Sequence, residues 1–253
     1  MKLQNKVALV TGSSQGIGRG IAVRLAREGA DLIINGRKED EGVRETLEQV
    51  RAEGRRACFI AADVGEAANC YRLIEQAVEQ MGRLDILVNN AGIIINKLVV
   101  DMTREDWERI QAVNATAAFL HCREAVKAMM PNKSGTIVNI ASYASYFAFP
   151  TIAAYTASKG ALAQLTRTLA LEAIEHGIRV NAIGVGDVVT NILDDVVEDG
   201  PGFLAKHGEA APIGRAAQPQ EIAEIVAFLA SDRASFMVGS VVMADGGMTV
   251  TAG

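Results

Sequence analysis

The sequence predicts an α/β fold in which a doubly wound parallel sheet of about seven strands carries helices on both faces. Short, mainly apolar runs alternate with longer amphipathic stretches through almost the whole chain, which is the pattern of repeated strand–helix units. Several short runs, such as Val7–Val10 and Ile86–Val88, are entirely apolar, as expected of strands buried on both faces of a parallel sheet. No long linker or internal repeat interrupts the alternation. We therefore expect residues 1–253 to form a single domain.

The individual elements follow from these runs. Seven strands are expected, at Lys6–Thr11, Asp31–Asn35, Ala57–Ala61, Leu84–Val88, Gly135–Ile140, Arg179–Ile183 and Ser240–Met243. Six helices are expected between them, at Gly16–Glu28, Glu39–Ala52, Ala67–Met81, Arg104–Ala128, Ile152–His176 and Pro219–Ala230. The apolar residues of these six stretches recur at helical spacing, which predicts one buried face for each helix.

The segment at about 184–218 breaks the alternation. It contains six glycines and two prolines around a short stretch at 191–197 that resembles a helix. A long, glycine-rich insertion after a strand is typical of a lid or a binding loop. The alternative is a disordered surface excursion. Phe203 and Leu204 favour a segment that packs onto another part of the molecule, so we expect a substrate lid.

Composition and charge exclude several function classes. The net charge is −5, with 25 basic and 30 acidic residues and no long basic run, so we expect no nucleic-acid partner. The apolar runs are far shorter than a membrane span, and the first residues lack a signal-peptide pattern, so we expect a cytoplasmic protein without membrane contact. Three widely spaced cysteines, Cys58, Cys70 and Cys122, indicate neither a disulfide framework nor a metal site.

The turn Thr11–Gly18 after the first strand has glycines at positions 12, 16 and 18. Glycines there allow a tight turn and let the backbone approach a pyrophosphate, while the following helix presents unpaired N–H groups to the phosphates. A strand before this turn and a helix after it are the context that gives the pattern its meaning. The sequence therefore predicts a Rossmann-type dinucleotide site, although a purely structural turn is the alternative.

The end of the second strand distinguishes the two nicotinamide dinucleotides. A carboxylate at this point binds the ribose hydroxyl of NAD, whereas an arginine accommodates the phosphate of NADP. Here the strand ends in Asn35-Gly36-Arg37-Lys38, with no acidic residue. Arg37 favours NADP(H) over NAD(H), because a guanidinium binds phosphate in bidentate fashion. The alternative is that Arg37 and Lys38 are only solvated charges of the next helix.

Tyr155 and Lys159 stand four residues apart, and therefore share one face of an expected helix. An ammonium group beside a phenol favours the phenolate, so we expect Lys159 to lower the pKa of Tyr155 and make it a general acid or base. Such a pair also occurs by accident on helix surfaces. Ser142, thirteen residues before Tyr155, and the glycine-rich turn favour the catalytic interpretation.

With these motifs the chain resembles the short-chain dehydrogenase/reductase superfamily over nearly its whole length. The resemblance rests on Thr11–Gly18, Asp63-Val64, Asn89-Asn90-Ala91-Gly92, Asn114, Ser142, Tyr155 with Lys159, and Asp245-Gly246-Gly247. Within the superfamily the chain is most similar to bacterial 3-oxoacyl-carrier-protein reductases and glucose 1-dehydrogenases. The resemblance implies a small carbonyl or alcohol substrate and a homotetramer.

The resemblance also implies roles for individual residues. Tyr155 exchanges a proton with the substrate, Ser142 binds the substrate oxygen, Lys159 holds the nicotinamide ribose, and Asn114 kinks its helix and holds a water next to Lys159. These four are the expected catalytic residues. The expected cofactor-binding residues are Gly12, Ser14, Gln15, Gly16, Ile17, Gly18, Arg37, Asp63, Val64, Asn90, Ala91, Gly92, Tyr155, Lys159, Val188 and Thr190. No metal ligand is expected.

The chain departs from the family pattern in two places. It has Val185-Gly186-Asp187 where relatives usually have Pro-Gly, and Gln15 where carrier-protein reductases often have arginine. Asp187 would either bind the hydroxyls of a polyol or disfavour an anionic substrate. Among the residues near Ser142, we expect Tyr146 to form a wall of the substrate pocket. His121, His176 and His207 are interpreted as structural, although His207 lies in the expected lid.

The leading hypothesis is an NADP(H)-dependent ketoreductase that transfers a hydride between nicotinamide and a carbonyl or alcohol substrate. A sugar or polyol dehydrogenase of the glucose 1-dehydrogenase type is the alternative. A non-catalytic nucleotide sensor is a third hypothesis, because a fold alone does not establish a function.

Overall fold

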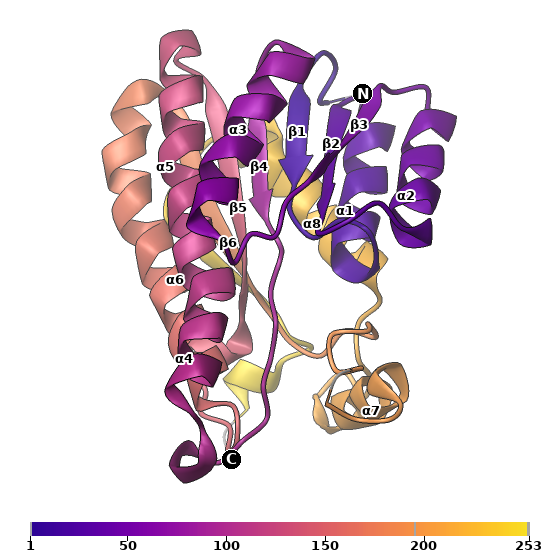
Figure 1. Ribbon diagram of the computed structural model, residues 1–253, viewed down its shortest axis with the longest axis vertical. Coiled ribbons are helices and arrows are strands. Elements are labelled where there is room, and N and C mark those ends of the chain that lie inside the picture. The colour runs from indigo at the N-terminus through magenta and orange to yellow at the C-terminus, as the bar shows by residue number, and fades with distance from the viewer. Residues whose placement is uncertain (1, 195, 252–253) are drawn as a thin grey trace.

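The computed structural model describes residues 2–194 and 196–251. Within them, seven strands form one sheet in the order β3-β2-β1-β4-β5-β6-β7, and every neighbouring pair is parallel (Figure 1). The strands are β1 (Val7–Val10), β2 (Asp31–Gly36), β3 (Ala57–Ala61), β4 (Ile86–Asn89), β5 (Gly135–Ser142), β6 (Ile178–Val185) and β7 (Val241–Ala244). The predicted seven-stranded parallel sheet is confirmed.

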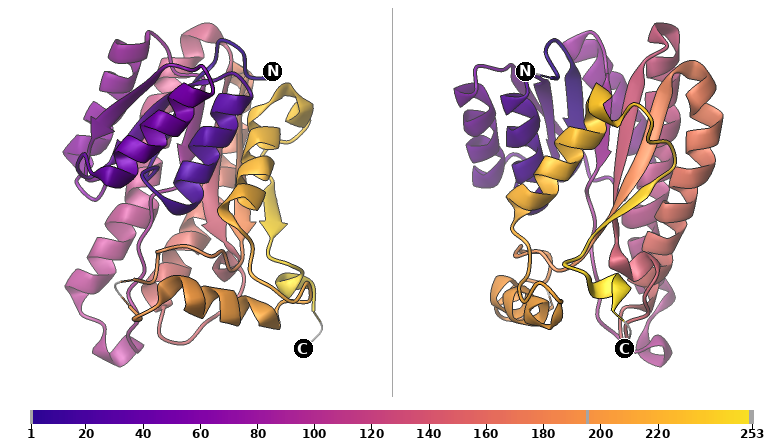
Figure 2. Two further views of the ribbon diagram at one scale, coloured as in Figure 1. Left: turned by 90° about the vertical axis from the view of Figure 1, so that its right-hand side faces the viewer. Right: turned by 180° about the vertical axis from the view of Figure 1, so that it is seen from behind.

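Helices cover both faces of the sheet. They are α1 (Gly16–Arg27), α2 (Glu41–Ala52), α3 (Ala67–Met81), α4 (Arg104–Gln111), α5 (Ala117–Met129), α6 (Ala153–Ala173), α7 (Gly200–His207) and α8 (Pro219–Ala230). Helices α1, α2 and α8 lie on one face, and α3, α5 and α6 lie on the other (Figures 1 and 2). None of the helices in residues 2–194 and 196–251 is long and apolar enough to cross a membrane.

Strands β1 to β6 contribute to two apolar cores, and β7 contributes to the one under α1 and α8. In β1, Ala8 and Val10 pack against α1 and α8, while Val7 and Leu9 belong to the core under α3 and α5. Successive side chains of a strand point to opposite faces of the sheet, so both sets must be apolar when both faces are covered. This arrangement explains why the strands read as unbroken apolar runs in the sequence.

The strand order reverses at β1, which pairs with β2 on one side and β4 on the other. At such a reversal the loops that follow the two central strands diverge, leaving a crevice at the carboxyl ends of the strands. In Figure 1 the arrows point toward this end of the molecule, and α7 lies beyond it. The fold therefore places the functional crevice between the sheet and α7.

The structure interrupts the helix expected at 104–128. It ends as α4 at Gln111, widens into a π-helical turn over Ala112–Thr116, and resumes as α5. The side chain of Asn114 lies within this turn, and its bonds to the loop after β4 account for the interruption. Such π-turns occur often at functional sites. The predicted helical run over 104–128 is therefore present, but a π-helical turn replaces regular α-helix at the position where the family resemblance implies a kink.

The helix expected at 191–197 is also wrong for its described residues, which form turns; residue 195 of this range lies outside the described residues. The helix of this segment is α7 instead. The carboxylate of Asp199 accepts a hydrogen bond from the Gly202 amide at 2.8 Å, and Pro201 occupies the first turn of α7. A capping aspartate and an early proline are both typical of a helix start, and both lie after residue 197.

The segment that carries α7 leaves the sheet and returns at a single point. The Ala217 amide donates to the Asp187 carbonyl at 2.9 Å, and the Val189 amide donates to the Ala217 carbonyl at 3.0 Å. These bonds form a short parallel bridge between Val188 and Ala217. Both ends of the segment are therefore fixed beside the crevice.

A buried arginine fixes α8 to the sheet. Arg179 of β6 is 9% exposed, and its guanidinium donates to the carbonyls of Leu229, Ser231 and Ala234 and to the Thr136 hydroxyl. Three of these acceptors belong to the end of α8 and the turn after it, where carbonyl groups lack helical partners. One side chain thus satisfies the carboxyl end of α8.

We expect Arg179→Lys to lower the free energy of unfolding by about 1–3 kcal/mol, because an ammonium group cannot reach all four acceptors and leaves buried carbonyls unpaired. Urea unfolding followed by circular dichroism measures the loss. The control is Arg44→Lys at an exposed position of α2, for which we expect a change within about 0.5 kcal/mol. Equal stability of the two variants would contradict this role of Arg179.

Candidate active site

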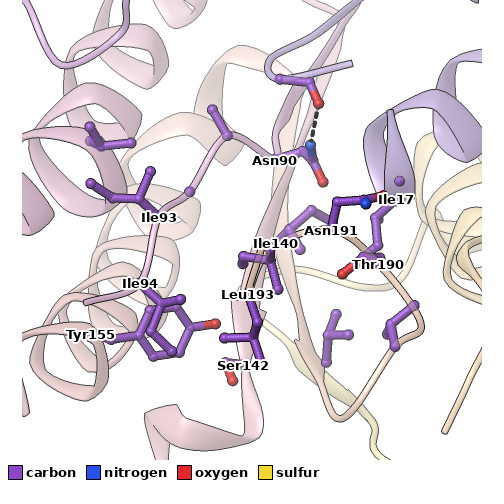
Figure 3. A pocket seen from close by; sticks show the side chains of 18 of the residues that line it. Ile17, Asn90, Ile93, Ile94, Ile140, Ser142, Tyr155, Thr190, Asn191 and Leu193 are labelled. Atoms are coloured by element: carbon purple, nitrogen blue, oxygen red, sulfur yellow. Dashed lines mark hydrogen bonds between the residues drawn. The ribbon is translucent and has the colours of Figure 1, made fainter. Parts of the chain in front are cut away.

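A cavity of about 720 Å³ lies at the carboxyl ends of the strands. It is lined by every expected cofactor-binding residue, and by three of the four expected catalytic residues, Ser142, Tyr155 and Lys159. The fourth, Asn114, lies outside the lining. Residues from the segment between β6 and α8, including Leu193, Val196, Phe203 and Leu204, complete the wall. Figure 3 shows Tyr155 and Ser142 on one side of the cavity and Ile17 and Thr190 on the other.

The turn between β1 and α1 has the geometry of a phosphate site. Gly12 and Gly16 have φ angles of 61° and 54°, which side chains disfavour. A Cβ atom at Gly18 would collide with the Gly12 carbonyl and the Asn90 amide. The side chain of Gln15, which directly precedes α1, makes no capping hydrogen bond to its first turn, and α1 begins at the cavity. The uncapped amides and the open glycine backbone fit a pyrophosphate at this point.

Asn90 connects the two loops that diverge at the strand reversal. Its side-chain amide donates to the carbonyls of Thr11 and Gly12 at 2.9 and 3.0 Å. The Thr11 hydroxyl in turn accepts hydrogen bonds from the Asn90 and Ala91 amides, both at 3.0 Å. These bonds hold the glycine turn against the loop after β4, so that both loops border the same cavity.

At the other end of the cavity, Asp63 after β3 forms an ion pair with Arg109 of α4, at 3.1 Å. Burial alone would raise the pKa of Asp63, but hydrogen bonds from the Gly65 amide and Arg109 lower it below its usual value. Arg37 also lines this end of the cavity and is exposed. Sequence reasoning missed Arg109 as a lining residue, because only the fold brings α4 next to the turn after β3.

The three expected catalytic side chains come from two elements. Ser142 ends β5, and Tyr155 and Lys159 lie one turn apart near the start of α6. Lys159 is buried, its ammonium group donates to the Ile140 carbonyl at 2.8 Å, and its Nζ atom lies 5.6 Å from the centre of the Tyr155 ring. The longer β5 places Ser142 at the end of the sheet, opposite this turn of α6.

The pKa values differ from the sequence-based expectation. Burial raises the pKa of Tyr155, a hydrogen bond with Ser142 opposes this effect, and the charge of Asp187 raises the pKa further. Burial also lowers the pKa of Lys159 to about 8. The prediction that Lys159 lowers the pKa of Tyr155 is therefore wrong. The ammonium group donates to the Ile140 carbonyl, and burial of the phenol raises its pKa. Tyr155 is protonated at neutral pH.

Asn114 supports the site from outside the cavity. Its amide group pairs with the backbone of Ile93 through two hydrogen bonds of 2.9 Å and donates to the Ser158 hydroxyl at 3.1 Å. Ser158 directly precedes Lys159 in α6. Asn114 thus connects the loop after β4 to the helix that carries the lysine. The water implied by the resemblance stays a prediction.

The substrate end of the cavity contains three polar residues that the sequence left unassigned or only suggested. Tyr143, Asp187 and His207 all line the cavity, and Tyr143 and His207 each contact Asp187. The expected pocket wall, Tyr146, is instead exposed, bonds to Arg167 and does not line the cavity. The turn Tyr143–Ser145 after β5 directs residue 143 rather than residue 146 inward. The sequence could not show which of Tyr143 and Tyr146 faces the cavity, because a turn has no repeating pattern of inward and outward residues.

Of the other two histidines, His121 is buried in α5, where its Nδ1 atom lies 3.0 Å from the Asn89 amide oxygen, and burial lowers its pKa to about 4. His176 is near the end of α6. Neither lines the cavity. No group of three or more histidine, cysteine or acidic side chains in residues 2–194 and 196–251 is arranged to hold a metal ion.

The fold and this cavity are those of a nicotinamide-dependent oxidoreductase built on a doubly wound sheet. A family model described as Enoyl-(Acyl carrier protein) reductase matches residues 12–249. The chain belongs to the short-chain dehydrogenase/reductase superfamily, whose members act on CH–OH and C=O groups with a nicotinamide cofactor.

Three similar proteins extend over almost the entire chain. The 3beta-hydroxysteroid dehydrogenase 1 of Eggerthella lenta is 38% identical, covering 99% of this chain and 96% of its own. The glucose 1-dehydrogenase 2 of Bacillus subtilis is 36% identical, with coverage of 98% and 96%. The crystal structure of a short-chain type dehydrogenase/reductase from Mycobacterium marinum matches with a TM-score of 0.92 and 31% identity, over 99% of this chain and 98% of that one.

Burying the Lys159 ammonium lowers stability in a pH-dependent way. Below about pH 8 the lysine is charged in both the folded and the unfolded state, so the burial cost is fully present; above its ordinary pKa of 10.5 both states are neutral and the cost is gone. We expect Lys159→Met to be more stable than the wild type at pH 7 by about 1–3 kcal/mol. This advantage should shrink as the pH rises from about 8 to 10.5.

Urea unfolding of both proteins across this pH range measures the difference. Lys38→Met, at an exposed position, is the control and should show no such trend. A stability difference for Lys159→Met that stays constant with pH would contradict the lowered pKa.

Proposed function

We propose that this protein is an NADPH-dependent reductase that converts a ketone or aldehyde into an alcohol and also catalyses the reverse reaction. The observation that carries the proposal is that Ser142, Tyr155 and Lys159 line one cavity together with the glycine turn of a dinucleotide site. The nicotinamide, when bound, supplies the hydride.

The residues of the chain supply proton transfer and orientation. Tyr155 is protonated at neutral pH, which is the state required of a general acid that donates to a carbonyl oxygen. The Ser142 hydroxyl is the second donor to that oxygen, where negative charge develops. Lys159 would hold the nicotinamide ribose, and Val188 and Thr190 would hold the carboxamide.

The protein acts as a single domain in which the segment at about 184–218 is the substrate lid. Its apolar residues Leu193, Val196, Phe203 and Leu204 line the cavity. A lid that excludes water strengthens the electrostatic contacts at the reacting atoms. A cofactor held by these residues would form the base of the substrate site, so we expect it to bind before the substrate.

We expect Tyr155→Phe to lower kcat by about 10²–10⁴-fold while it retains cofactor binding, because only the proton donor is removed. The loss of NADPH absorbance measures turnover with an acetoacetyl thioester, a β-keto ester and an aryl ketone, and glucose with the oxidised cofactor tests the reverse direction. Fluorescence titration with NADPH measures binding. Tyr146→Phe, a change at an exposed tyrosine nearby, should retain full activity.

Undiminished turnover by Tyr155→Phe would remove Tyr155 from the mechanism. Tight NADPH binding by the wild type without turnover of any substrate would favour the alternative of a non-catalytic nucleotide sensor.

The preference for NADP(H) rests on the residues after β2. Asn35 is buried and its side chain bonds to Gly12, Ile60 and Ala62, so it is committed to the backbone. Arg37 is the next charged residue and lines the cavity. The nearest carboxylate in the lining, Asp63, is paired with Arg109. This end of the cavity therefore favours a phosphate over a ribose hydroxyl.

We expect Arg37→Asp to raise the KM for NADPH about 10–100-fold and to lower the KM for NADH, because one charge-assisted hydrogen bond to phosphate is lost and a carboxylate is gained. Steady-state kinetics with both cofactors measures the ratio of kcat/KM. Lys38→Asp makes the same change in charge at the next residue, outside the cavity lining, and should shift the ratio much less. An unchanged ratio in Arg37→Asp would exclude Arg37 from cofactor choice.

A sugar or polyol dehydrogenase is the second candidate, favoured by Asp187 at the substrate end and by the similarity to glucose 1-dehydrogenase 2. An acidic carrier protein is a poor partner for this chain. Of the four basic residues that could receive it, Arg104 is paired with Glu108, Arg109 with Asp63, and Arg123 and Lys127 share Glu124. We therefore favour a free, small substrate over a carrier-bound one.

We also propose a cytoplasmic homotetramer. Free cysteines at positions 58, 70 and 122 suit a reducing compartment. Exposed apolar side chains supply surfaces for association: Phe119 on α5, Leu171 on α6, Ile174 directly after α6 and Phe236 beyond α8.

A further inference from the structure

We propose that Asp187, held between Tyr143 and His207, is a specificity site that binds a second, non-reacting hydroxyl of a neutral substrate and rejects substrates with a carboxylate. The inference rests on the proposed function, because it names the substrate class of the same cavity. The preferred substrates are hydroxyketones and the diols or polyols formed from them.

Three elements contribute to this site. Tyr143 follows β5, Asp187 follows β6, and His207 ends α7 in the lid. The Tyr143 hydroxyl donates to Oδ1 of Asp187 at 3.1 Å, and Nδ1 of His207 lies 2.9 Å from Oδ2. The Asp187 side chain is only 10% exposed, and its backbone carbonyl accepts the Ala217 amide. Two side chains thus hold the carboxylate, and a third bond holds the backbone of Asp187.

The site retains capacity for a substrate. Each carboxylate oxygen can accept two hydrogen bonds, and among the described residues each oxygen of Asp187 has one side-chain donor. Nδ1 of His207 must carry a proton to donate to Oδ2, so a neutral His207 keeps Nε2 as an acceptor. All three residues line the cavity that contains Ser142 and Tyr155. A substrate hydroxyl in this part of the cavity can therefore donate a hydrogen bond to the Asp187 carboxylate or to Nε2 of His207.

The charged side chains that line the cavity disfavour an anionic substrate. The charged residues of the lining are Arg37, Asp63, Arg109, Lys159 and Asp187. Arg37, Asp63 and Arg109 form the cluster near the end of β2, and Lys159 donates to Ile140. Among the residues that the structure describes, Asp187 therefore has no permanent cation at the substrate end. Burial raises the pKa values of both Tyr143 and Tyr155 there, and the charge of Asp187 raises them further. A substrate carboxylate would face this charge in a partly desolvated space.

The surrounding wall makes the polar site selective. Phe149 packs against Tyr143 with ring centres 4.8 Å apart, and Phe203 stacks on His207 at 5.9 Å. Ile94, Leu193 and Val196 also line the cavity. These apolar side chains offer a substrate hydroxyl no hydrogen-bond partner, so its placement at Asp187 has a large effect on affinity.

Three small ketones test the inference: butanone, its hydroxylated counterpart acetoin, and the carboxylate acetoacetate. We expect the wild-type kcat/KM with NADPH to be about ten-fold or more higher for acetoin than for butanone, and lower for acetoacetate than for butanone. Asp187→Asn removes the charge with little change of shape. It should reduce the acetoin-to-butanone ratio about ten-fold and raise the acetoacetate-to-butanone ratio.

The ratios are measured within each protein, so a partial loss of folded enzyme cancels. Glu209→Gln, which removes the same charge from an exposed lid position, should keep both wild-type ratios. The pH profile of kcat gives an independent measure, since Asp187→Asn should lower the apparent pKa assigned to Tyr155 while Glu209→Gln should not.

The outcomes separate the two proposals. Turnover of the ketones without a preference for acetoin, or with ratios that Asp187→Asn leaves unchanged, overturns the specificity site and retains the reductase. Absence of NADPH oxidation with every ketone, including those used for Tyr155→Phe, overturns the proposed function itself.

Discussion

The structure depends on the parallel pairing of β1 with both β2 and β4. Because the chain must run in opposite lateral directions from this strand, the loops after β1 and β4 separate and leave their backbone groups without ladder partners. The Asn90 amide and the Thr11 hydroxyl supply the missing bonds across the gap. The opening is therefore braced by side chains and remains free for a ligand, and the other site residues are arranged around it.

The sequence was sufficient for most of the fold, because strands that are covered on both faces of a sheet have short, unbroken apolar runs, and these can be recognised without tertiary information. It was insufficient where a tertiary contact overrides a local pattern. The helix through Asn114 reads as continuous, yet the bonds of its amide to Ile93 widen one turn. The lid helix was misplaced because helical spacing at 191–197 outweighed the start signals at Asp199 and Pro201.

The residues of the candidate site also fall into two groups, those that could be found from the sequence and those that only the fold brings to the cavity. Residues in motifs, such as Gly12 and Tyr155, were found from sequence because their chemistry and spacing are local. Arg109, Tyr143 and His207 were missed or left unassigned, because each reaches the cavity from an element whose position only the fold determines. The pKa of Tyr155 was wrong for a related reason: helical spacing brings Lys159 close, but it shows neither the burial of the phenol nor the carbonyl that takes the ammonium.

The bridge between Val188 and Ala217 has a consequence for how the protein can vary. It brings the two ends of the lid together at the edge of the crevice, so the residues between them form a loop whose closure is already fixed. The entropic cost of such a loop rises only slowly with its length. Insertions, deletions or wholesale exchange of the intervening residues should therefore be tolerated by the sheet. The lid can therefore be replaced while the sheet is kept, and a different lid would give the same hydride-transfer scaffold a different substrate.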